Sequence, residues 1–171
     1  MKRTLPLALI LPVALLSLPA VGADSFQARL RGKNEVPPVS TKTKGLFKIT
    51  MRNRSADFRL RVDRGKRVTQ AHLHCGASGV NGPVVAFLAG FHDNGWNTKG
   101  RTASGKPVDW VRARLTNANV IETPVSGACP MKINATLASL LAAMKADYIY
   151  VNVHTIANPG GEVRGQIKPK P

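Results

Sequence analysis

The stretch LFKITMRNRSADFRLRVD, Leu46 to Asp63, decides the fold class because apolar side chains recur at every second position. A period of two places alternate side chains on opposite faces of a β-strand. The apolar positions are Phe47, Ile49, Met51, Phe58, Leu60 and Val62. The segment NRSA between the two runs predicts a hairpin turn. We therefore expect an antiparallel hairpin with one face in the core and a basic face in solvent.

Further segments on either side of this hairpin also indicate strands. The ranges predicted as strands are 25–32, 68–75, 83–89, 148–155 and 162–168. A long polar loop is expected over 91–107, and one short amphipathic helix over about 134–146, with Asn134 as its N-cap. The fold class is therefore all-β, an antiparallel β-sandwich of two sheets with one short helix.

The first 23 residues predict a signal peptide. Lys2 and Arg3 precede an apolar run that ends in small residues at Ala23. Cleavage there would export a single domain, residues 24–171, to the periplasm or the extracellular space, with no membrane-spanning segment in the mature chain. An oxidising compartment favours a disulfide between Cys75 and Cys129, the two cysteines of the chain. The alternative makes Cys75 a thiolate metal ligand.

The net charge of +16 is concentrated in one part of the chain. Ten Lys or Arg residues lie between Lys42 and Arg67, against two aspartates. Such a field attracts acidic polymers or acidic proteins, and it predicts an anion-binding face. The residues assigned to that face are Lys48, Arg52, Arg59 and Arg61. The alternative is a solvated basic face, and the scarcity of aromatic residues argues against specific binding of nucleic acid.

The segment QAHLHC, Gln70 to Cys75, carries the candidate metal ligands. His72 and His74 are two apart on one strand and therefore share a face. His154 belongs to the strand predicted near the C-terminus, and the three imidazoles converge if the two strands are neighbours. Imidazole nitrogens suit copper or zinc. His92 is a candidate fourth ligand, and the alternative is that all these histidines are ordinary hydrogen-bonded strand residues.

Three segments together resemble the CHRD domain family, named after chordin. They are NEVPPV, AHLHCGASGVNGPVVAFL and YVNVHTIANPGGEVRGQI, at residues 34–39, 71–88 and 150–167. The resemblance implies an immunoglobulin-like or superoxide-dismutase-like β-sandwich. A fainter likeness to copper/zinc superoxide dismutase implies a copper bound by the strand histidines, with Arg164 beside it. The chain departs from that family because it lacks a second cluster of His and Asp residues.

These patterns support three hypotheses of function. The first is an exported metal-binding module that stores, transports or senses copper or zinc, with Asn152 and Arg164 beside the ion. The second is a metal-free adhesion module that binds acidic polymers or proteins through the basic face. The third is a copper-dependent redox enzyme acting on a small oxidant such as superoxide. Glu35 and the pair Glu162 and Arg164 are expected to make structural ion pairs.

Overall fold

The computed structural model describes residues 24–90 and 108–170, which form an antiparallel β structure with one short α-helix. The strands are β1 (Ser25–Arg31), β2 (Lys44–Met51), β3 (Ala56–Asp63), β4 (Val68–Cys75), β5 (Val84–Ala89), β6 (Val108–Leu115), β7 (Ile149–Thr155), β8 (Val163–Gln166) and β9 (Lys168–Pro169). The helix is α1 (Leu137–Lys145), and two 3₁₀ turns are η1 (Gly32–Asn34) and η2 (Asn117–Asn119). The predicted all-β class with one helix is confirmed.

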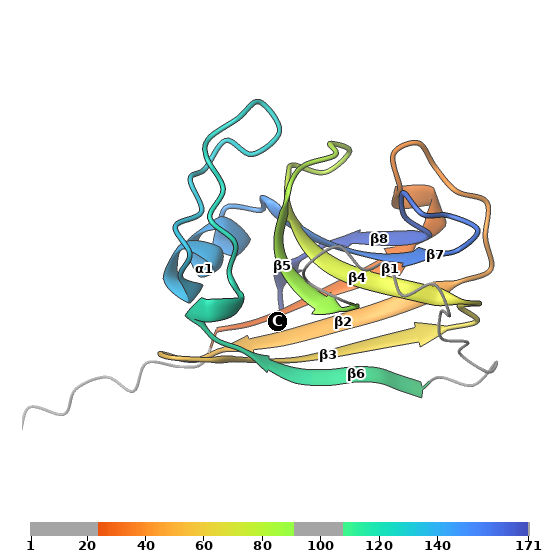
Figure 1. Ribbon diagram of the computed structural model, residues 1–171, viewed down its shortest axis with the longest axis horizontal. Helices are drawn as coiled ribbons and strands as arrows, with labels where there is room; N and C mark the ends of the chain where they lie inside the picture. Colours follow the sequence, from red (N-terminus) through yellow and green to blue (C-terminus); the bar gives the residue numbers. More distant parts are fainter. Residues whose placement is uncertain (1–23, 91–107, 171) are drawn as a thin grey trace, which may run out of the picture.

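The strands belong to one continuous sheet in the order β5-β4-β7-β8-β1-β2-β3-β6, with β9 paired to β1. The sheet curls on itself, so that β4 and β5 lie over β2, β3 and β6 in Figure 1. An isolated bridge between Ala86 of β5 and Val120 just after β6 brings the two ends of the sheet together. The two layers expected of a sandwich are thus two halves of a nearly closed, barrel-like sheet.

The hairpin predicted from its period of two is β2 and β3. Phe47 lies opposite Leu60 and Ile49 opposite Phe58 across the two strands. All four side chains are buried in the core, whereas Lys48 and Arg59 between them are exposed. Burial of apolar surface stabilises this register by about 25 cal/mol for each square ångström. A slip of one residue would instead place charges in the core.

Strands β4 and β7 differ from the hairpin because they are buried on both faces along their whole length. One face contributes apolar side chains such as Leu73 and Val151 to the core. The other face carries polar side chains, including His72 and His154, that are nevertheless buried. A buried polar face needs internal hydrogen bonds or a bound ligand, and it is therefore the place to look for a site.

The helix is shorter than predicted, and its N-cap differs. It begins at Leu137 rather than near Asn134, because the side chain of Thr136 accepts a hydrogen bond from the backbone N–H of Ser139 at 3.2 Å. Thr136 has extended backbone angles, as an N-cap residue requires. Among the described residues, no helix has both the length and the apolar character to cross a membrane.

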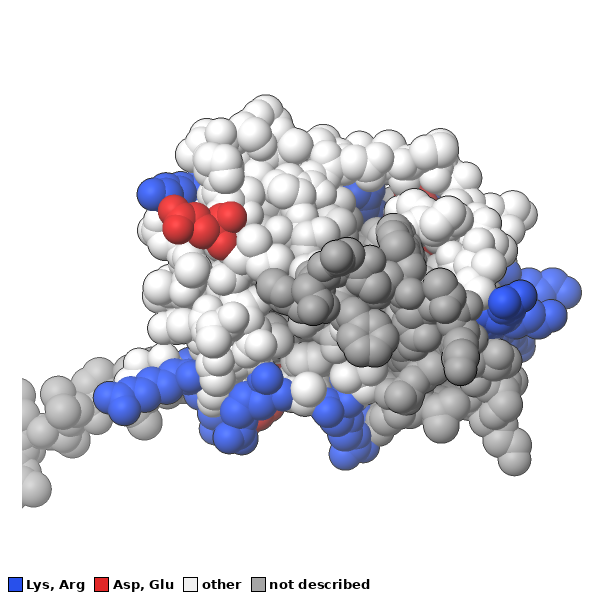
Figure 2. Space-filling view, in the orientation of Figure 1, with Lys and Arg blue, Asp and Glu red and all other residues white. Residues whose placement is uncertain are grey.

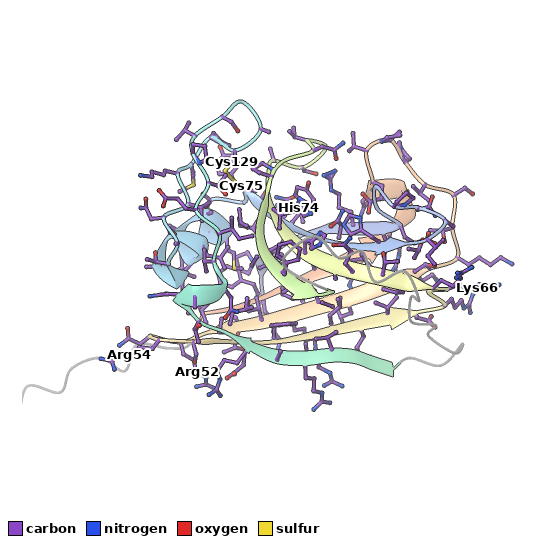
Figure 3. All side chains as sticks on the ribbon, in the orientation of Figure 1. Arg52, Arg54, Lys66, His74, Cys75 and Cys129 are labelled. Atoms are coloured by element: carbon purple, nitrogen blue, oxygen red, sulfur yellow. A yellow bond between two sulfur atoms is a disulfide. The ribbon has the colours of Figure 1, made fainter. Side chains whose placement is uncertain are left out.

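Strand β6 was not predicted from the sequence. It pairs with β3 at the end of the sheet, opposite to the end formed by β5. The predicted signal peptide, residues 1–23, and the predicted loop 91–107 lie outside the described residues. The predicted disulfide joins Cys75 at the end of β4 to Cys129, and Figure 3 shows both cysteines beside the loop that follows β6.

Candidate metal centre

The polar face of β4 and β7 places the three predicted ligands side by side. Antiparallel pairing sets His72 opposite Asn152, and Gln70 opposite His154. Alternation along each strand directs all four side chains to the same face. The next pair along the ladder is His74 opposite Tyr150. The strand of His154 therefore neighbours the strand of His72 and His74, which was the condition for the three imidazoles to converge.

The three imidazole rings form one compact cluster. The ring centroid of His72 lies 4.7 Å from that of His154 and 5.5 Å from that of His74. One ring nitrogen from each histidine lies within 4.8 Å of those of the other two. The side chains are almost inaccessible to solvent, at 5%, 9% and 5% exposure for His72, His74 and His154. The cluster could therefore hold one metal ion.

Neighbouring oxygens fix which nitrogen of His72 and His74 carries the proton. Nε2 of His72 lies 2.5 Å from the side-chain oxygen Oε1 of Gln70, and Nδ1 of His74 lies 2.8 Å from the carbonyl oxygen of Gly82. Because these oxygens only accept, each nitrogen must donate, and the other nitrogen of a neutral ring keeps a lone pair. Those other atoms, Nδ1 of His72 and Nε2 of His74, are buried without a hydrogen-bond partner.

His154 is oriented in the same way by the loop between β7 and β8. Its Nδ1 lies 2.9 Å from the carbonyl oxygen of Pro159, and its Nε2 lies 2.9 Å from the side-chain amide of Asn152. The atom of Asn152 at this distance is Oδ1, which like the carbonyl of Pro159 only accepts, so a neutral ring donates to one of the two oxygens. Backbone and side-chain oxygens that orient imidazoles from behind are typical of histidines that bind metals.

Burial keeps all three rings neutral. Burial, together with the charges of His154 and His74, lowers the pKa of His72 to about 3. Burial lowers the pKa of His74 to about 4 despite the hydrogen bond to Gly82, which raises it. The pKa of His154 is also lowered by burial, against the opposing effect of the bond to Pro159. Neutral imidazole is the form that binds a metal ion.

A stack of rings supports the cluster from one side. The ring of Tyr150 lies parallel to the ring of His74, and the guanidinium of Arg164 lies 3.7 Å from the centroid of Tyr150. Arg164 is 3% exposed and donates through Nη2 to the backbone oxygen of Val80 and the side-chain oxygen of Asn81, both at 2.9 Å. Asn152 and Arg164 thus lie beside the cluster, and their role beside a bound ion stays a prediction; Figure 3 shows where His74 sits.

The predicted ion pair between Glu162 and Arg164 is wrong. Glu162 instead accepts hydrogen bonds from four side chains, which hold its carboxylate away from Arg164. The donors are Thr41 at 2.5 Å, Thr43 at 2.9 Å, Thr155 at 3.0 Å and Asn158. Burial raises the pKa of Glu162, but these four bonds lower it by more, so that its pKa lies below the usual value.

Glu35 also makes no ion pair among the described residues, although it is buried beside Gly161. Burial raises the pKa of Glu35 to about 7, with the charge of Arg164 opposing and that of Glu162 adding to the rise. Its oxygen Oε1 has no hydrogen-bond partner, and neither have Nε and Nη1 of Arg164. The carboxyl group is therefore a buried acid rather than the anchor of an ion pair.

Two other candidate ligands have clear outcomes. Cys75 is bonded to Cys129, so its sulfur is not a thiolate and the alternative of a cysteine ligand is wrong. His92 lies outside the described residues and stays a prediction as a fourth ligand.

The predicted anion-binding residues do not share one environment. Lys48, Arg59 and Arg61 point to the outer side of β2 and β3, with Lys48 directly opposite Arg59. Arg52 lies at the hairpin turn and donates to Asp57 at 3.2 Å. Arg114 of β6 donates to the same carboxylate at 2.7 Å, and these two arginines hold the pKa of Asp57 below its usual value. Arg52 therefore does not belong with the other three cations.

Sequence reasoning missed the groups that orient the imidazoles. Gln70 could have been found, because it is two residues before His72 and shares its face. Tyr150 is four residues before His154 on the same strand and therefore shares its face, but its stacking on His74 depends on the pairing of β4 with β7. The carbonyl oxygens of Gly82 and Pro159 could not be predicted from the pattern of side chains, since every residue has a carbonyl.

Comparison with known proteins agrees with the resemblance seen in the sequence. The family described as the CHRD domain matches residues 26–167. This match runs from β1 to the residue after β8 and includes all three clustered histidines. No curated protein and no solved structure matches the chain.

Proposed function

The chain belongs to the CHRD domain family, and from this membership and the histidine cluster we propose an exported protein that binds one copper or zinc ion to store, transport or sense it. The observation that carries the proposal is the pair of unpartnered imidazole nitrogens, Nδ1 of His72 and Nε2 of His74. Leaving a polar atom buried and unpaired costs about 1–3 kcal/mol. A metal ion would give both nitrogens a partner.

The donor set fits copper or zinc. Three imidazoles leave one coordination position open, and the cluster found among the described residues contains histidines alone. Two nitrogens bound to one tetrahedral zinc at about 2.0–2.1 Å lie roughly 3.4 Å apart. The three nitrogens lie within 4.8 Å of one another, so binding would draw the rings closer together. A bound ion would supply Lewis acidity and, if it is copper, one-electron chemistry.

Two observations support export. The Cys75–Cys129 disulfide is typical of proteins in oxidising compartments. The family match begins at residue 26, just after the segment with the pattern of a signal peptide. We therefore place the mature protein in the periplasm or the extracellular space, where it would meet copper and zinc from the environment.

Elemental analysis tests the proposal. The protein is purified from an oxidising compartment, offered copper and zinc separately in modest excess, and dialysed. We expect about one retained ion per chain for the wild type, and little for His72→Ala and His154→Ala. Circular dichroism would show that both variants fold. Unchanged stoichiometry in both folded variants would refute the site.

His92→Ala tests the predicted fourth ligand, because it leaves the three clustered imidazoles in place. It is expected to keep the full stoichiometry. A weaker affinity in this variant would assign His92 as the fourth ligand, whereas an unchanged affinity would leave the fourth position to water or a partner.

A further inference from the structure

A groove on the outer side of the sheet is lined mainly by cationic side chains. It has a volume of about 230 Å³ and lies across β1, β2 and β3. Its lining residues are Arg29, Arg31, Lys44, Gly45, Leu46, Arg61 and Asp63. Four cations therefore face one carboxylate, and Asp63 lies 3.9 Å from Arg64. We call this feature the basic groove.

Strand register, rather than a flexible loop, brings the cations of the basic groove together. Arg31 of β1 lies directly opposite Lys44 of β2, and Arg29 and Arg61 flank Leu46 from the two sides. Like charges directly opposite each other on neighbouring strands destabilise a sheet. Acids lie opposite two of these cations, Asp63 opposite Lys44 and Asp109 opposite Arg61, whereas Arg31 has Lys44 opposite it and Arg29 has Leu46. This excess of cations over acids favours a role for the charges outside folding.

The cationic surface continues beyond the groove along the strands. Lys48 of β2 faces Arg59 of β3, and Arg59 faces Arg112 of β6. At about 3.3 Å per residue, the four steps from Lys44 to Lys48 extend the strip by roughly 13 Å. Figure 2 shows the Lys and Arg side chains gathered along the lower edge of the molecule, whereas the upper part carries few charges.

We propose that the basic groove binds an acidic polysaccharide, a linear polymer whose carboxylate or sulfate groups pair with Arg29, Arg31 and Lys44. The length of the cationic strip favours a polymer over a single small anion. Arginine side chains bind carboxylate and sulfate-like groups through two parallel hydrogen bonds. This site is separate from the histidine cluster, so it stands whether or not the protein binds a metal.

The composition of the groove favours a polysaccharide over nucleic acid or a membrane. Its lining contains no aromatic ring on which bases could stack, as single-stranded nucleic acid would need. Large hydrophobic side chains that are exposed among the described residues lie away from β1, β2 and β3, so this face offers nothing to insert into lipid. They are Val36, Val80, Val125 and Ile156.

A pair of double variants tests this proposal. Arg29→Ser/Lys44→Ser removes two cations from the basic groove. The control, Arg54→Ser/Lys132→Ser, removes one arginine and one lysine elsewhere, so that both variants lose the same net charge. Arg54 lies at the hairpin turn in Figure 3, and Lys132 makes an exposed ion pair with Glu122 at 3.6 Å. Such exposed pairs contribute little to stability.

Affinity is measured by titration calorimetry against heparin, polygalacturonate, duplex DNA and phosphatidylglycerol vesicles, at several salt concentrations. For one or both polysaccharides, we expect the groove variant to bind at least about tenfold more weakly than wild type, a change of about 1.4 kcal/mol. The slope of log affinity against log salt should become shallower by about two, one for each cation removed from the groove. The control should keep the wild-type slope.

Three results would overturn the proposal. Equal losses in the groove variant and the control would mean that only net charge matters. The groove would be a nucleic-acid site if the protein bound duplex DNA more tightly than either polysaccharide and if that binding also depended on Arg29 and Lys44. Binding to the vesicles alone would make it a membrane contact.

Discussion

The imidazole ring of His74 lies parallel to the phenol ring of Tyr150, with 4.8 Å between the ring centroids and 8° between the planes. The backbone N–H of Gly82 donates to the Tyr150 hydroxyl at 3.1 Å, and the carbonyl of the same glycine accepts from Nδ1 of His74. Tyr150 therefore holds His74 in two ways, by stacking on its ring and by fixing the residue that orients it.

Removing this support should weaken metal binding without removing a ligand. Tyr150→Leu is expected to reduce the affinity for copper or zinc by about tenfold or more, the usual cost of losing a group that orients a ligand. Tyr150→Phe keeps the stacked ring and loses only the hydroxyl, so its loss should be smaller. Competition titration with a chelator measures both. Equal affinity in all three proteins would show that Tyr150 does not position His74.

Alternation in the sequence was sufficient to predict β2 and β3, since it reflects one buried and one exposed face. It failed for β6, whose sequence VDWVRARL also alternates. Within residues 111–115 of β6, only Leu115 is buried. Strand β6 pairs with a single neighbour, β3. A strand at the end of a sheet buries less apolar surface and therefore has a weaker pattern.

The histidine cluster could be predicted only in part. The spacing of His72 and His74 was enough to place both on one face, and the pairing of their strand with that of His154 was a condition that the sequence could not decide. Pairing between distant strands depends on the topology of the whole sheet. The same limit explains the failed pair of Glu162 with Arg164, since Thr41 and Thr43 come from a distant loop.

The N-cap of α1 provides a direct test of the corrected helix boundary. Thr136→Ala should lower the free energy of unfolding by about 1 kcal/mol, because it removes the acceptor for the N–H of Ser139. Asn134→Ala is the matched control, since the sequence alone suggested Asn134 as the cap and its side chain does not cap the helix. Denaturant titration compares them. A larger loss for Asn134→Ala would restore the original boundary.

Gly161 occupies a backbone conformation that disfavours side chains. Its φ is +142°, and an added Cβ would lie 2.8 Å from the carboxyl atoms of Glu35. Gly161→Ala should therefore destabilise the fold by about 1–3 kcal/mol. The neighbouring Gly160 has open space around its Cα, so Gly160→Ala serves as control and should change stability by less than about 0.5 kcal/mol. Similar thermal midpoints for the two variants would contradict this account.

Loss of the disulfide should affect both stability and the histidine cluster. Cys75 and Cys129 are 54 residues apart, and the chain-entropy estimate for a loop of that size is about 4 kcal/mol. Cys75→Ala/Cys129→Ala should lower the free energy of unfolding by up to that amount. Because Cys75 adjoins His74, metal affinity should fall as well. A double variant with wild-type stability would show that the disulfide does not constrain the unfolded chain.

Glu35 gives the protein a specific dependence on pH. Its pKa is raised to about 7 from 4.5, chiefly by burial, while Arg164 opposes and Glu162 adds to the rise. Between these two values the unfolded chain has released the proton of Glu35 and the folded chain retains it. The folded state then binds more protons than the unfolded state, so stability falls as the pH rises through this window and stays reduced above pH 7.

Glu35→Gln should remove this dependence, because glutamine has nearly the same shape and cannot ionise. Near pH 4 the variant and the wild type should unfold at similar denaturant concentrations. Near pH 8 the variant should be more stable by on the order of 1–3 kcal/mol, since it buries no charge. Taking the difference between the two proteins at each pH cancels the titration of the buried histidines, which destabilises both as the pH falls below 6.5. A difference that stays constant from pH 4 to pH 8 would show that folding leaves the pKa of Glu35 near 4.5, and would contradict this account.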